Sequence, residues 1–319
     1  MLYKASAPGS LMLLGEYAVL HGKKAIVCAV NKRIHVSIAP RTDDQLCIYS
    51  TLGQYTDTVT HFTVSPPFEF VLTALKSKQH LLPTGCDIAI EAEFPSNIGL
   101  GSSAAVSVAI LAALNQWLSP SSLTEHVLWQ EVKAVVDQVQ RNGSGADIAA
   151  SIFGGTLVFQ PTPWRVTPLK QHPPICAVYS GKKTPTPEAI QLASQRYIRF
   201  PELFQHIDAL SDQLVNEAIP VIEQQQWETL GYLWRIAQGL LQIMEVSNDV
   251  IDRIVQTLIQ QPDIYGAKIS GSGLGDCVVG LGALALGIFP QDDAQKEEGV
   301  KQVPITVTSQ GVRIDTHST

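Results

Sequence analysis

The most constraining feature of the sequence is a glycine-containing turn between a strand pattern and an apolar helix pattern. Residues Cys86 to Phe94 alternate apolar with polar or acidic side chains, which predicts a strand with one buried face. The turn SNIGLGSS at 96–103 follows, and the apolar run from Ala104 to Leu118 predicts a buried helix. The first turn of a helix offers free N–H groups and about half a positive charge from its dipole. The turn is therefore a candidate anion site that needs no lysine.

Known phosphate-loop patterns do not describe this turn. The Gly-Lys-Ser/Thr of a Walker A loop is absent, and the glycine spacing is not GxGxxG. The hydroxyls of Ser102 and Ser103 could donate hydrogen bonds to phosphate or bind Mg²⁺. Taken by itself, however, the segment is equally well explained as a tight turn with a serine N-cap.

Length and proline distribution predict two domains. A chain of 319 residues exceeds the usual size of one domain, and seven prolines fall between Pro161 and Pro187. We expect a boundary there, with domains at 1–160 and 161–319. The second half has four helix patterns, at 189–195, 204–224, 227–245 and 249–260, followed by a strand, a glycine loop and a strand. This arrangement predicts an α+β fold.

Several further elements are predicted from local patterns. The strand patterns at 25–39 and 46–51 indicate a hairpin, and 68–78 indicates a helix. Ser122 and Glu125 form a capping-box pattern before a helix with apolar residues at helical spacing. The segment ITVTSQGVRI at 305–314 predicts a strand that completes a domain.

Composition restricts the class of partner and leaves a small-molecule substrate open. The formal net charge is −7 and no Lys/Arg run occurs, which argues against nucleic acid or a membrane surface as partner. Five widely spaced cysteines without a CxxC indicate neither a disulfide framework nor a zinc site. The first residues lack a signal-peptide core, and the longest apolar run is shorter than the roughly 20 residues that cross a bilayer. These features predict a cytoplasmic protein.

Two carboxylates and a second glycine loop are further candidates. Glu16 lies beside glycine in the apolar run LMLLGEYAVLHG, where a carboxylate needs a partner or a ligand, although a surface position at a strand end would also explain it. Asp147 follows GSGA and begins a predicted helix, as an N-cap or as a base for a hydroxyl that attacks phosphate. The loop KISGSGLGDC at 268–277 could lie against phosphate or serve as a hairpin connection.

Together and in this order, four motifs resemble those of the GHMP kinase superfamily: APGSLMLLGEYAVLHG (7–22), SNIGLGSSAA (96–105), GSGADIAASIFGG (143–155) and KISGSGLGDCVVGLG (268–282). The resemblance implies a two-lobed α+β fold. Its N-terminal lobe would be like domain 2 of ribosomal protein S5, its C-terminal lobe would be ferredoxin-like, and ATP and substrate would bind between them. Within the superfamily, GEYAVLHG and EVSNDVIDRI are most similar to the mevalonate kinases, which act in isoprenoid precursor synthesis.

The resemblance also implies roles for single residues. Asp147 would be the catalytic aspartate, Ser103 and Asp137 would bind Mg²⁺, and Glu16, with Tyr17 and Ser10, would contact the substrate. The segment that surrounds the ATP phosphates would consist of Asn97, Ile98, Gly99, Leu100, Gly101, Ser102 and Ser103. A homodimer is compatible with the resemblance, while the sequence itself does not determine the oligomeric state.

One departure from the family pattern concerns the first motif. Mevalonate and phosphomevalonate kinases usually have Ala-Pro-Gly-Lys, whereas this chain has Ser10 at the position of the lysine. That cation would stabilise phosphoryl charge, so another group should replace it, and Lys4, Lys23 and Lys24 are candidates.

Three readings of the function stay open at this stage. The first is ATP-dependent phosphorylation of mevalonate. The second is a phosphomevalonate kinase, because GLGDC and GSGADIAAS are similar to that group; a substrate phosphate would then need a cation such as Lys182, Lys183, Arg196 or Arg199. The third is a nucleotide-binding homologue without turnover. A purely structural module would leave three glycine loops unexplained.

Overall fold

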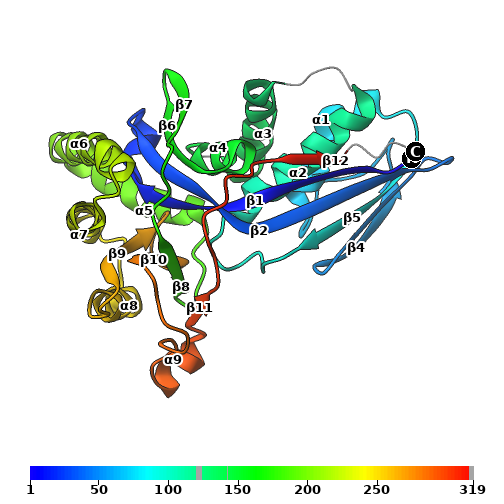
Figure 1. The fold of residues 1–319 in the computed structure, drawn as a ribbon. Helices are drawn as coiled ribbons and strands as arrows, with labels where there is room; N and C mark the ends of the chain where they lie inside the picture. Colours follow the sequence, from blue (N-terminus) through cyan, green and yellow to red (C-terminus); the bar gives the residue numbers. More distant parts are fainter. Residues whose placement is uncertain (120–123, 142, 316–319) are drawn as a thin grey trace.

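Two β-sheets organise the chain in the computed structural model, which describes residues 1–119, 124–141 and 143–315 (Figure 1). The larger sheet has a main path and a branch. In spatial order its main path is β12 (Arg313–Asp315), β1 (Tyr3–Leu14), β2 (Ala25–Pro40), β5 (Cys86–Ala92), β3 (Gln45–Ser50) and β4 (Gly53–Thr58). The branch consists of β6 (Thr156–Pro161), which pairs with β2, and β7 (Trp164–Pro168), which pairs with β6.

Four helices lie on one face of the larger sheet (Figure 1). They are α1 (Glu69–Lys78), α2 (Ser102–Leu118), α3 (Glu125–Gln140) and α4 (Ala146–Phe153). Helix α2 packs against β1, β2, α1 and α3, so every residue from Val108 to Leu114 is buried. A helix enclosed in this way is apolar on all sides, which is the pattern that the sequence shows.

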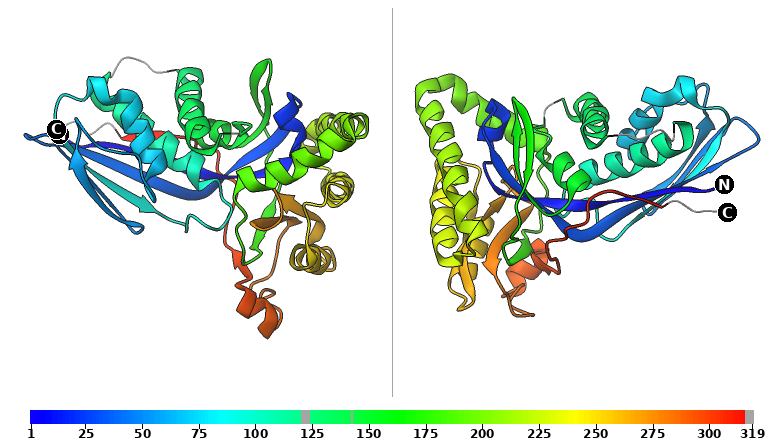
Figure 2. Two further views of the ribbon diagram at one scale, coloured as in Figure 1. Left: turned by 180° about the vertical axis from the view of Figure 1, so that it is seen from behind. Right: turned by 45° about the horizontal axis from the view of Figure 1, so that its top comes forward.

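The smaller sheet belongs to the second half of the chain. Its strands, in spatial order, are β11 (Lys301–Val303), β8 (Ile175–Tyr179), β10 (Cys277–Gly282) and β9 (Ile264–Ser270). Helices α7 (Trp227–Ile243) and α8 (Asp249–Ile259) pack on this sheet, and α6 (Pro201–Glu223) packs on α7 (Figure 2). Gly231 allows α7 to approach β9, because a Cβ at this position would lie 2.2 Å from the carbonyl oxygen of Tyr265.

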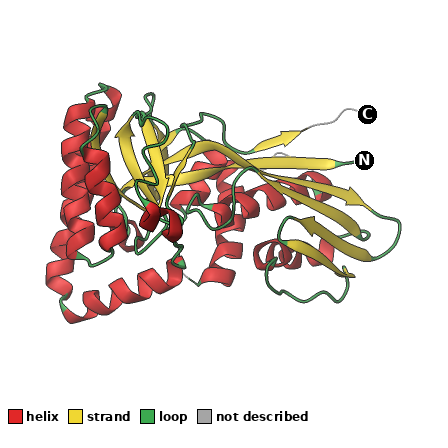
Figure 3. Cartoon of the chain, turned by 90° about the horizontal axis from the view of Figure 1, so that it is seen from below, coloured by secondary structure: helices red, strands yellow, loops and turns green. Residues whose placement is uncertain are grey.

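The remaining elements are short or connecting. Helix α5 (Thr186–Arg199) joins β8 to α6, and α9 (Asp293–Glu298) precedes β11. Figure 3 distinguishes the helices, in red, from the strands, in yellow. Two 3₁₀ turns, η1 (Ala18–His21) and η2 (Gln79–Leu81), follow β1 and α1. None of the helices in the described parts of the chain combines the length and the apolar character that crossing a membrane requires.

Local predictions agree with the structure better than predictions of pairing. The helices expected in the second half and the helix at 68–78 are present. The predicted hairpin of 25–39 with 46–51 is wrong: β3 pairs in antiparallel fashion with β4 and in parallel with β5, which is inserted between β3 and β2. Leu46 and Ile48 of β3 are buried and belong to the main hydrophobic core.

Two other expectations concern chain ends and caps. Ser122 of the predicted capping box lies outside the described residues, and Thr124 is the N-cap of α3, where its side chain accepts a hydrogen bond from the N–H of Val127. The C-terminal segment pairs with the larger sheet through a bridge of Val307 to Val30 and through β12 on β1. Because β12 belongs to the first sheet, the chain crosses between the two parts twice, and a boundary at residue 161 stays a prediction.

Candidate active site

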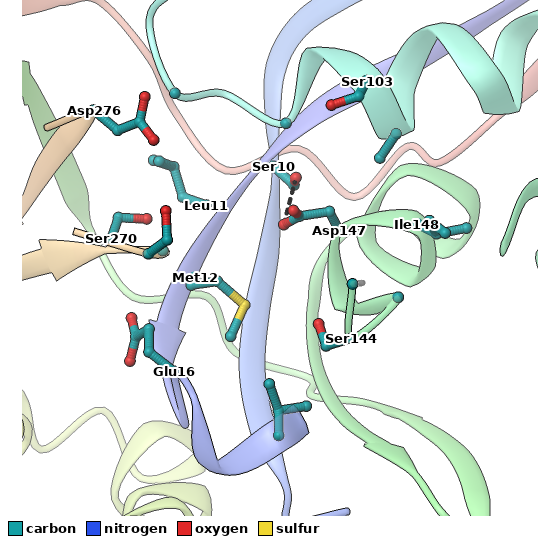
Figure 4. A pocket seen from close by; sticks show the side chains of 18 of the residues that line it. Ser10, Leu11, Met12, Glu16, Ser103, Ser144, Asp147, Ile148, Ser270 and Asp276 are labelled. Carbon is teal, nitrogen blue, oxygen red and sulfur yellow. Dashed lines mark hydrogen bonds between the residues drawn. The ribbon is translucent and has the colours of Figure 1, made fainter. Parts of the chain in front are cut away.

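One pocket gathers motif segments that lie far apart in the sequence. Its walls come from β1 and the turn after it, the glycine loop at 99–104, the end of α3, the turn at 143–148, Lys183 and the loop at 270–276. Figure 4 shows Ser10, Ser103, Asp147 and Asp276 around this pocket. Because β1 belongs to the larger sheet and β9 to the smaller one, the pocket lies where the two parts of the chain meet.

The glycine loop presents a helix N-terminus to the pocket. Helix α2 begins at Ser102, and its N-cap is Gly101, in the left-handed conformation with φ of 63° and without a side-chain cap. The first N–H groups of such a helix have no intrahelical partners and attract anions, together with the helix dipole. The Ser102 hydroxyl donates to the carbonyl oxygen of Ser96 at 3.0 Å, which closes the turn. The predicted anion site is therefore at a real helix start.

Both glycines of the loop face side chains from other segments. A Cβ at Gly101 would lie 2.2 Å from the Ser10 hydroxyl oxygen, and one at Gly99 would lie 2.6 Å from the Cβ of Asp276. Both glycines also have positive φ, of 63° and 73°. The loop thus needs glycine for its backbone conformation and for its close approach to β1 on one side and to the second glycine loop on the other.

Asp147 is the carboxylate at the centre of the pocket. It lies in the first turn of α4, whose N-cap is Gly145 rather than Asp147 itself. Trp129 of α3 holds the preceding turn by donating from Nε1 to the carbonyl oxygen of Gly145 at 3.0 Å. Burial raises the pKa of Asp147, and a hydrogen bond donated by the Ser10 hydroxyl to Oδ1 at 3.1 Å lowers it in part. A partly desolvated carboxylate with a raised pKa is suited to accept a proton from a hydroxyl.

Glu16 lies in the same pocket and has a buried partner. The Lys268 ammonium donates to the Glu16 carboxylate, and the Lys268 and Glu16 residues are 0% and 7% exposed. Burial lowers the pKa of Lys268, and the charge of Glu16 and the hydrogen bond to it raise it in part. Lys268 is in β9, so the pair links the turn after β1 to the smaller sheet. Tyr17 makes a second link, from its hydroxyl to the carbonyl oxygen of Ser272.

The second glycine loop brings a carboxylate to the pocket. Asp276 is 7% exposed, and its main chain is in the left-handed conformation with φ of 61°. Its Oδ1 is buried and has no hydrogen-bond partner. Burial raises the pKa of Asp276 to about 6; the charge of Lys183 lowers it and that of Asp147 raises it. Lys183 itself donates from Nζ to the carbonyl oxygen of Ser96 at 2.7 Å, at the start of the turn that carries the first glycine loop.

The structure brings most, but not all, of the predicted residues to the pocket. Those that line it are Ser10, Glu16, Tyr17, Gly99, Gly101, Ser102, Ser103 and Asp147. Ile98 and Leu100 point into the core, where they are 3% and 1% exposed, and Asn97 is exposed outside the pocket. Their main chains still shape the loop, because the carbonyl oxygen of Leu100 accepts from the N–H of Ser10 at 3.1 Å.

Asp137, the second predicted metal ligand, does not line the pocket. Its Oδ2 accepts from the Lys133 ammonium one turn earlier in α3, while its Oδ1 has no hydrogen-bond partner. Gln140, one turn later, lines the pocket instead and donates from Nε2 to the Ser103 hydroxyl at 3.3 Å. Nothing in the sequence pattern singled out Gln140, and a role for Asp137 in metal binding stays a prediction.

The lysines considered as replacements at Ser10 lie elsewhere. Lys24 donates from Nζ to the side-chain oxygen of Asn216 at 2.7 Å, and Lys23 lines a different hollow beside it. Lys4 is near the opposite end of β1, where its main chain lies opposite Asp315 of β12 in the sheet. Among the described side chains, Lys183 is the only Lys or Arg that lines the pocket. The side chain of Arg196 is not among those described.

The geometry suits phosphoryl transfer to a hydroxyl. An anion-binding helix start, a hydroxyl at Ser103 and a carboxylate with a raised pKa share one pocket. Such transfer depends on holding phosphate oxygens and on orienting the attacking oxygen, which these groups can do.

Comparison with known proteins agrees with this arrangement. The profile of the GHMP kinases N terminal domain matches residues 68–155, and that of GHMP kinases C terminal matches residues 218–305. A mevalonate kinase of Archaeoglobus fulgidus is 35% identical over 280 residues, which cover 87% of this chain and 91% of that protein.

Two solved structures show the same fold. The mevalonate kinase of L. major in complex with R-mevalonate has a TM-score of 0.74 at 22% identity, covering 97% of this chain and 96% of that one. Phosphomevalonate kinase of Streptococcus pneumoniae, in complex with phosphomevalonate and AMPPNP, has a TM-score of 0.77 at 18% identity, covering 95% and 99%. The two-lobed α+β fold expected from the motifs is confirmed, and the chain belongs to the GHMP kinase family.

Proposed function

We propose that this protein transfers the γ-phosphoryl group of ATP to the hydroxyl of mevalonate. The observation that carries the proposal is the Ser10–Asp147 pair, which places a carboxylate with a raised pKa in the same pocket as the glycine loop. The 35% identity to a mevalonate kinase over most of the chain supports mevalonate as the acceptor.

The nucleotide phosphates would lie against the glycine loop. Gly99 and Gly101 have no side chain to occupy that space, and the N–H groups at the start of α2 are directed away from the helix body toward it. The Ser102 hydroxyl is engaged with Ser96, whereas the Ser103 hydroxyl lines the pocket next to Gln140. The loop thus offers mainly main-chain donors, with the Ser103 hydroxyl as an oxygen ligand.

The residues around the loop also fit a magnesium ion. Mg²⁺ is usually held by one or two carboxylates together with substrate phosphates. Ser103 supplies a hydroxyl, and the buried Oδ1 of Asp276 and Oδ1 of Asp137 both lack hydrogen-bond partners. Bound Mg²⁺ would neutralise charge on the phosphate oxygens. Which of the two carboxylates takes part is a prediction that metal titration of single variants would decide.

Asp147 would accept the proton of the attacking hydroxyl. The Ser10 hydroxyl holds Oδ1 in place, which leaves Oδ2 for the acceptor. Desolvation raises the pKa of the carboxylate, so proton transfer from an alcohol becomes less unfavourable than it would be to an exposed aspartate. Ser10, Asp147 and Glu16 would surround the acceptor, because all three line the pocket beside the glycine loop.

A panel of acceptors tests the proposal. ADP release would be measured with Mg·ATP and each of mevalonate, phosphomevalonate, homoserine and galactose. We expect turnover with mevalonate to exceed turnover with the others. Preference for phosphomevalonate would move the enzyme to the next phosphorylation, and ATP binding without any turnover would favour a non-catalytic homologue. The homodimer and the cytoplasmic location stay predictions; light scattering of the purified protein checks the first.

A further inference from the structure

The pocket lacks the cation that the first motif usually supplies. Ser10 is 2% exposed, and its hydroxyl donates to Asp147, so this position brings no positive charge. A polyphosphate and an acidic substrate would then share one pocket with the carboxylates of Asp147 and Asp276, while the carboxylate of Glu16 is already paired with Lys268. Transfer of a phosphoryl group requires positive charge at the phosphate oxygens, which a magnesium ion supplies only in part.

Lys183 is placed to supply that charge from the other side of the pocket. It follows β8 in the second half of the chain and lines the pocket together with the glycine loop. Its Nζ donates to the carbonyl oxygen of Ser96, five residues before Gly101. An ammonium group has three donors, so one bond to a carbonyl leaves two for phosphate oxygens. Lys183 is also exposed, which lets its stem turn toward a ligand.

Main-chain hydrogen bonds fix the loop that carries Lys183. The N–H of Asp276 donates to the carbonyl oxygen of Lys182 at 2.7 Å, and the N–H of Ser180 donates to that of Asp276 at 2.9 Å. The Thr184 hydroxyl donates to the carbonyl oxygen of Leu274 at 2.9 Å. The segment 180–184 and the second glycine loop therefore form one unit, which we call the cationic loop pair.

The cationic loop pair docks on the turn that leads into α2. The Cys277 thiol donates to the carbonyl oxygen of Ile98 at 2.9 Å, and Gly99 lies against Asp276. Lys183 reaches Ser96 in the same turn. Lys183, Asp276 and Cys277 thus hold the turn and its glycine loop from one side. Ser10 contacts the loop at Gly101 from the other side.

Asp276 lies beside Lys183 in the cationic loop pair. Its N–H donates to the carbonyl oxygen of Lys182, the residue before Lys183, and the side chains of Asp276 and Lys183 both line the pocket. The alternative is that Lys183 only ties the two loops together. That role would account for its hydrogen bond to Ser96. It would not explain why Lys183 also lines the pocket, where it is the only described Lys or Arg.

We propose that Lys183 binds the phosphate oxygens of the nucleotide and replaces the lysine missing at Ser10, with Asp276 as its positioning residue. The role of Lys183 in turnover rests on the proposed function, but its role in nucleotide binding does not. The cation would come from the second half of the chain, so the phosphates would be held by both parts of the protein at once.

Lys183→Met tests the proposal, with Lys182→Met as the matched control. Lys182 is exposed in the same loop, does not line the pocket and keeps its carbonyl contact to Asp276 when its side chain changes. We expect kcat/KM for Mg·ATP to fall about 100-fold in Lys183→Met and less than about threefold in Lys182→Met. Equal values for the two variants would overturn the proposal.

Calorimetric binding of AMPPNP separates this proposal from the choice of acceptor. Lys183→Met should bind AMPPNP at least about tenfold more weakly than Lys182→Met, whichever acceptor the enzyme uses. Adding Ser10→Lys to Lys183→Met should restore part of the lost affinity, since it returns a cation to the first motif. If Lys183→Met binds AMPPNP as wild type does, Lys183 is only a structural tie to Ser96.

Asp276→Asn checks the positioning role. If Asp276 acts only by aiming Lys183, Asp276→Asn should weaken AMPPNP binding in the wild-type background but have little further effect in Lys183→Met. Additive losses in the double variant would show that Asp276 acts independently of Lys183 and would contradict the assigned role.

Discussion

The hydroxyl of Ser10 and the carboxylate of Asp147, 137 residues apart in sequence, meet at 3.1 Å in the pocket between the two sheets. Ser10 also touches the glycine loop, since a Cβ on Gly101 would lie 2.2 Å from its oxygen. One small side chain therefore joins the loop that would hold phosphate to the carboxylate that would receive a proton. A serine at this position acts as a hydrogen-bond donor to Asp147 rather than as a cation.

Replacing Ser10 by alanine should move the pH profile of the reaction. The hydrogen bond from Ser10 lowers the pKa of Asp147, so its loss should raise that pKa further. The acidic limb of kcat/KM, which follows ionisation of the base, should then shift to higher pH. Ser144→Ala is the control, because this pocket serine accepts from the N–H of Ala146 and does not bond Asp147. Coincident limbs in wild type and Ser10→Ala would refute this role of Ser10.

Gly101→Ala should weaken nucleotide binding. The new methyl group would collide with the Ser10 oxygen, and φ of 63° is strained for alanine. We expect AMPPNP to bind at least about tenfold more weakly by calorimetry, which corresponds to about 1.4 kcal/mol. Gly239→Ala on α7 is the control, since no atom lies within 4 Å of a Cβ there. Equal affinities in the two variants would show that the loop does not hold the nucleotide.

Breaking the Glu16–Lys268 pair should destabilise the fold strongly. Lys268→Met would leave the carboxylate of Glu16 buried without its partner, which typically costs about 3–5 kcal/mol. The double variant Glu16→Gln/Lys268→Met removes both charges, so it should recover much of the loss in urea unfolding. Arg253→Met breaks the exposed Arg253–Glu298 pair and should cost less than about 1 kcal/mol. Losses that simply add in the double variant would argue against a coupled pair.

Asp276→Asn should stabilise the protein more at neutral pH than at acidic pH. Burial raises the pKa of Asp276 to about 6 in the fold against 3.8 for the ordinary group, while the charge of Lys183 lowers it and that of Asp147 raises it. An acid whose folded pKa is raised loses stability as the pH rises between these two values, because its ionised form is disfavoured in the fold.

The neutral amide avoids that loss, so the gain from Asp276→Asn should grow by about 1–2 kcal/mol between about pH 5 and pH 7.5. Urea unfolding at both values measures it, and exposed Asp293→Asn is the control. A gain that is the same at both values would mean that Asp276 does not titrate in this range.

Patterns within a short stretch of sequence predicted the local structure and part of the site. The strand, glycine turn and apolar helix from Cys86 to Leu118 are present, because alternation, glycine and helical spacing act over a few residues. The partner of β3 could not be predicted in this way. Its parallel pairing with β5 joins residues about 40 positions apart, where sheet packing rather than turn chemistry decides the neighbour.

The cation at the pocket could not be predicted for the same reason. The candidates to replace the lysine at Ser10, namely Lys4, Lys23 and Lys24, lie elsewhere. Lys183, which the sequence suggests only as a partner for a substrate phosphate, lines the pocket from the other half of the chain. Gln140 had no detectable signal, since a glutamine in an amphipathic helix is ordinary. Asp147, by contrast, has a local signal, because a carboxylate two residues after a glycine turn lies at a helix start. The structure places it in the first turn of α4, where it lines the pocket, and its catalytic role stays a prediction.

The most direct test compares wild type with Asp147→Asn in ADP release with Mg·ATP and mevalonate, together with AMPPNP binding. We predict that turnover with mevalonate falls about 10²- to 10⁴-fold in the variant while AMPPNP affinity stays within about threefold, since Asp147 acts on the acceptor hydroxyl. Turnover with mevalonate that survives in Asp147→Asn, or its absence in wild type, would contradict the proposed reaction.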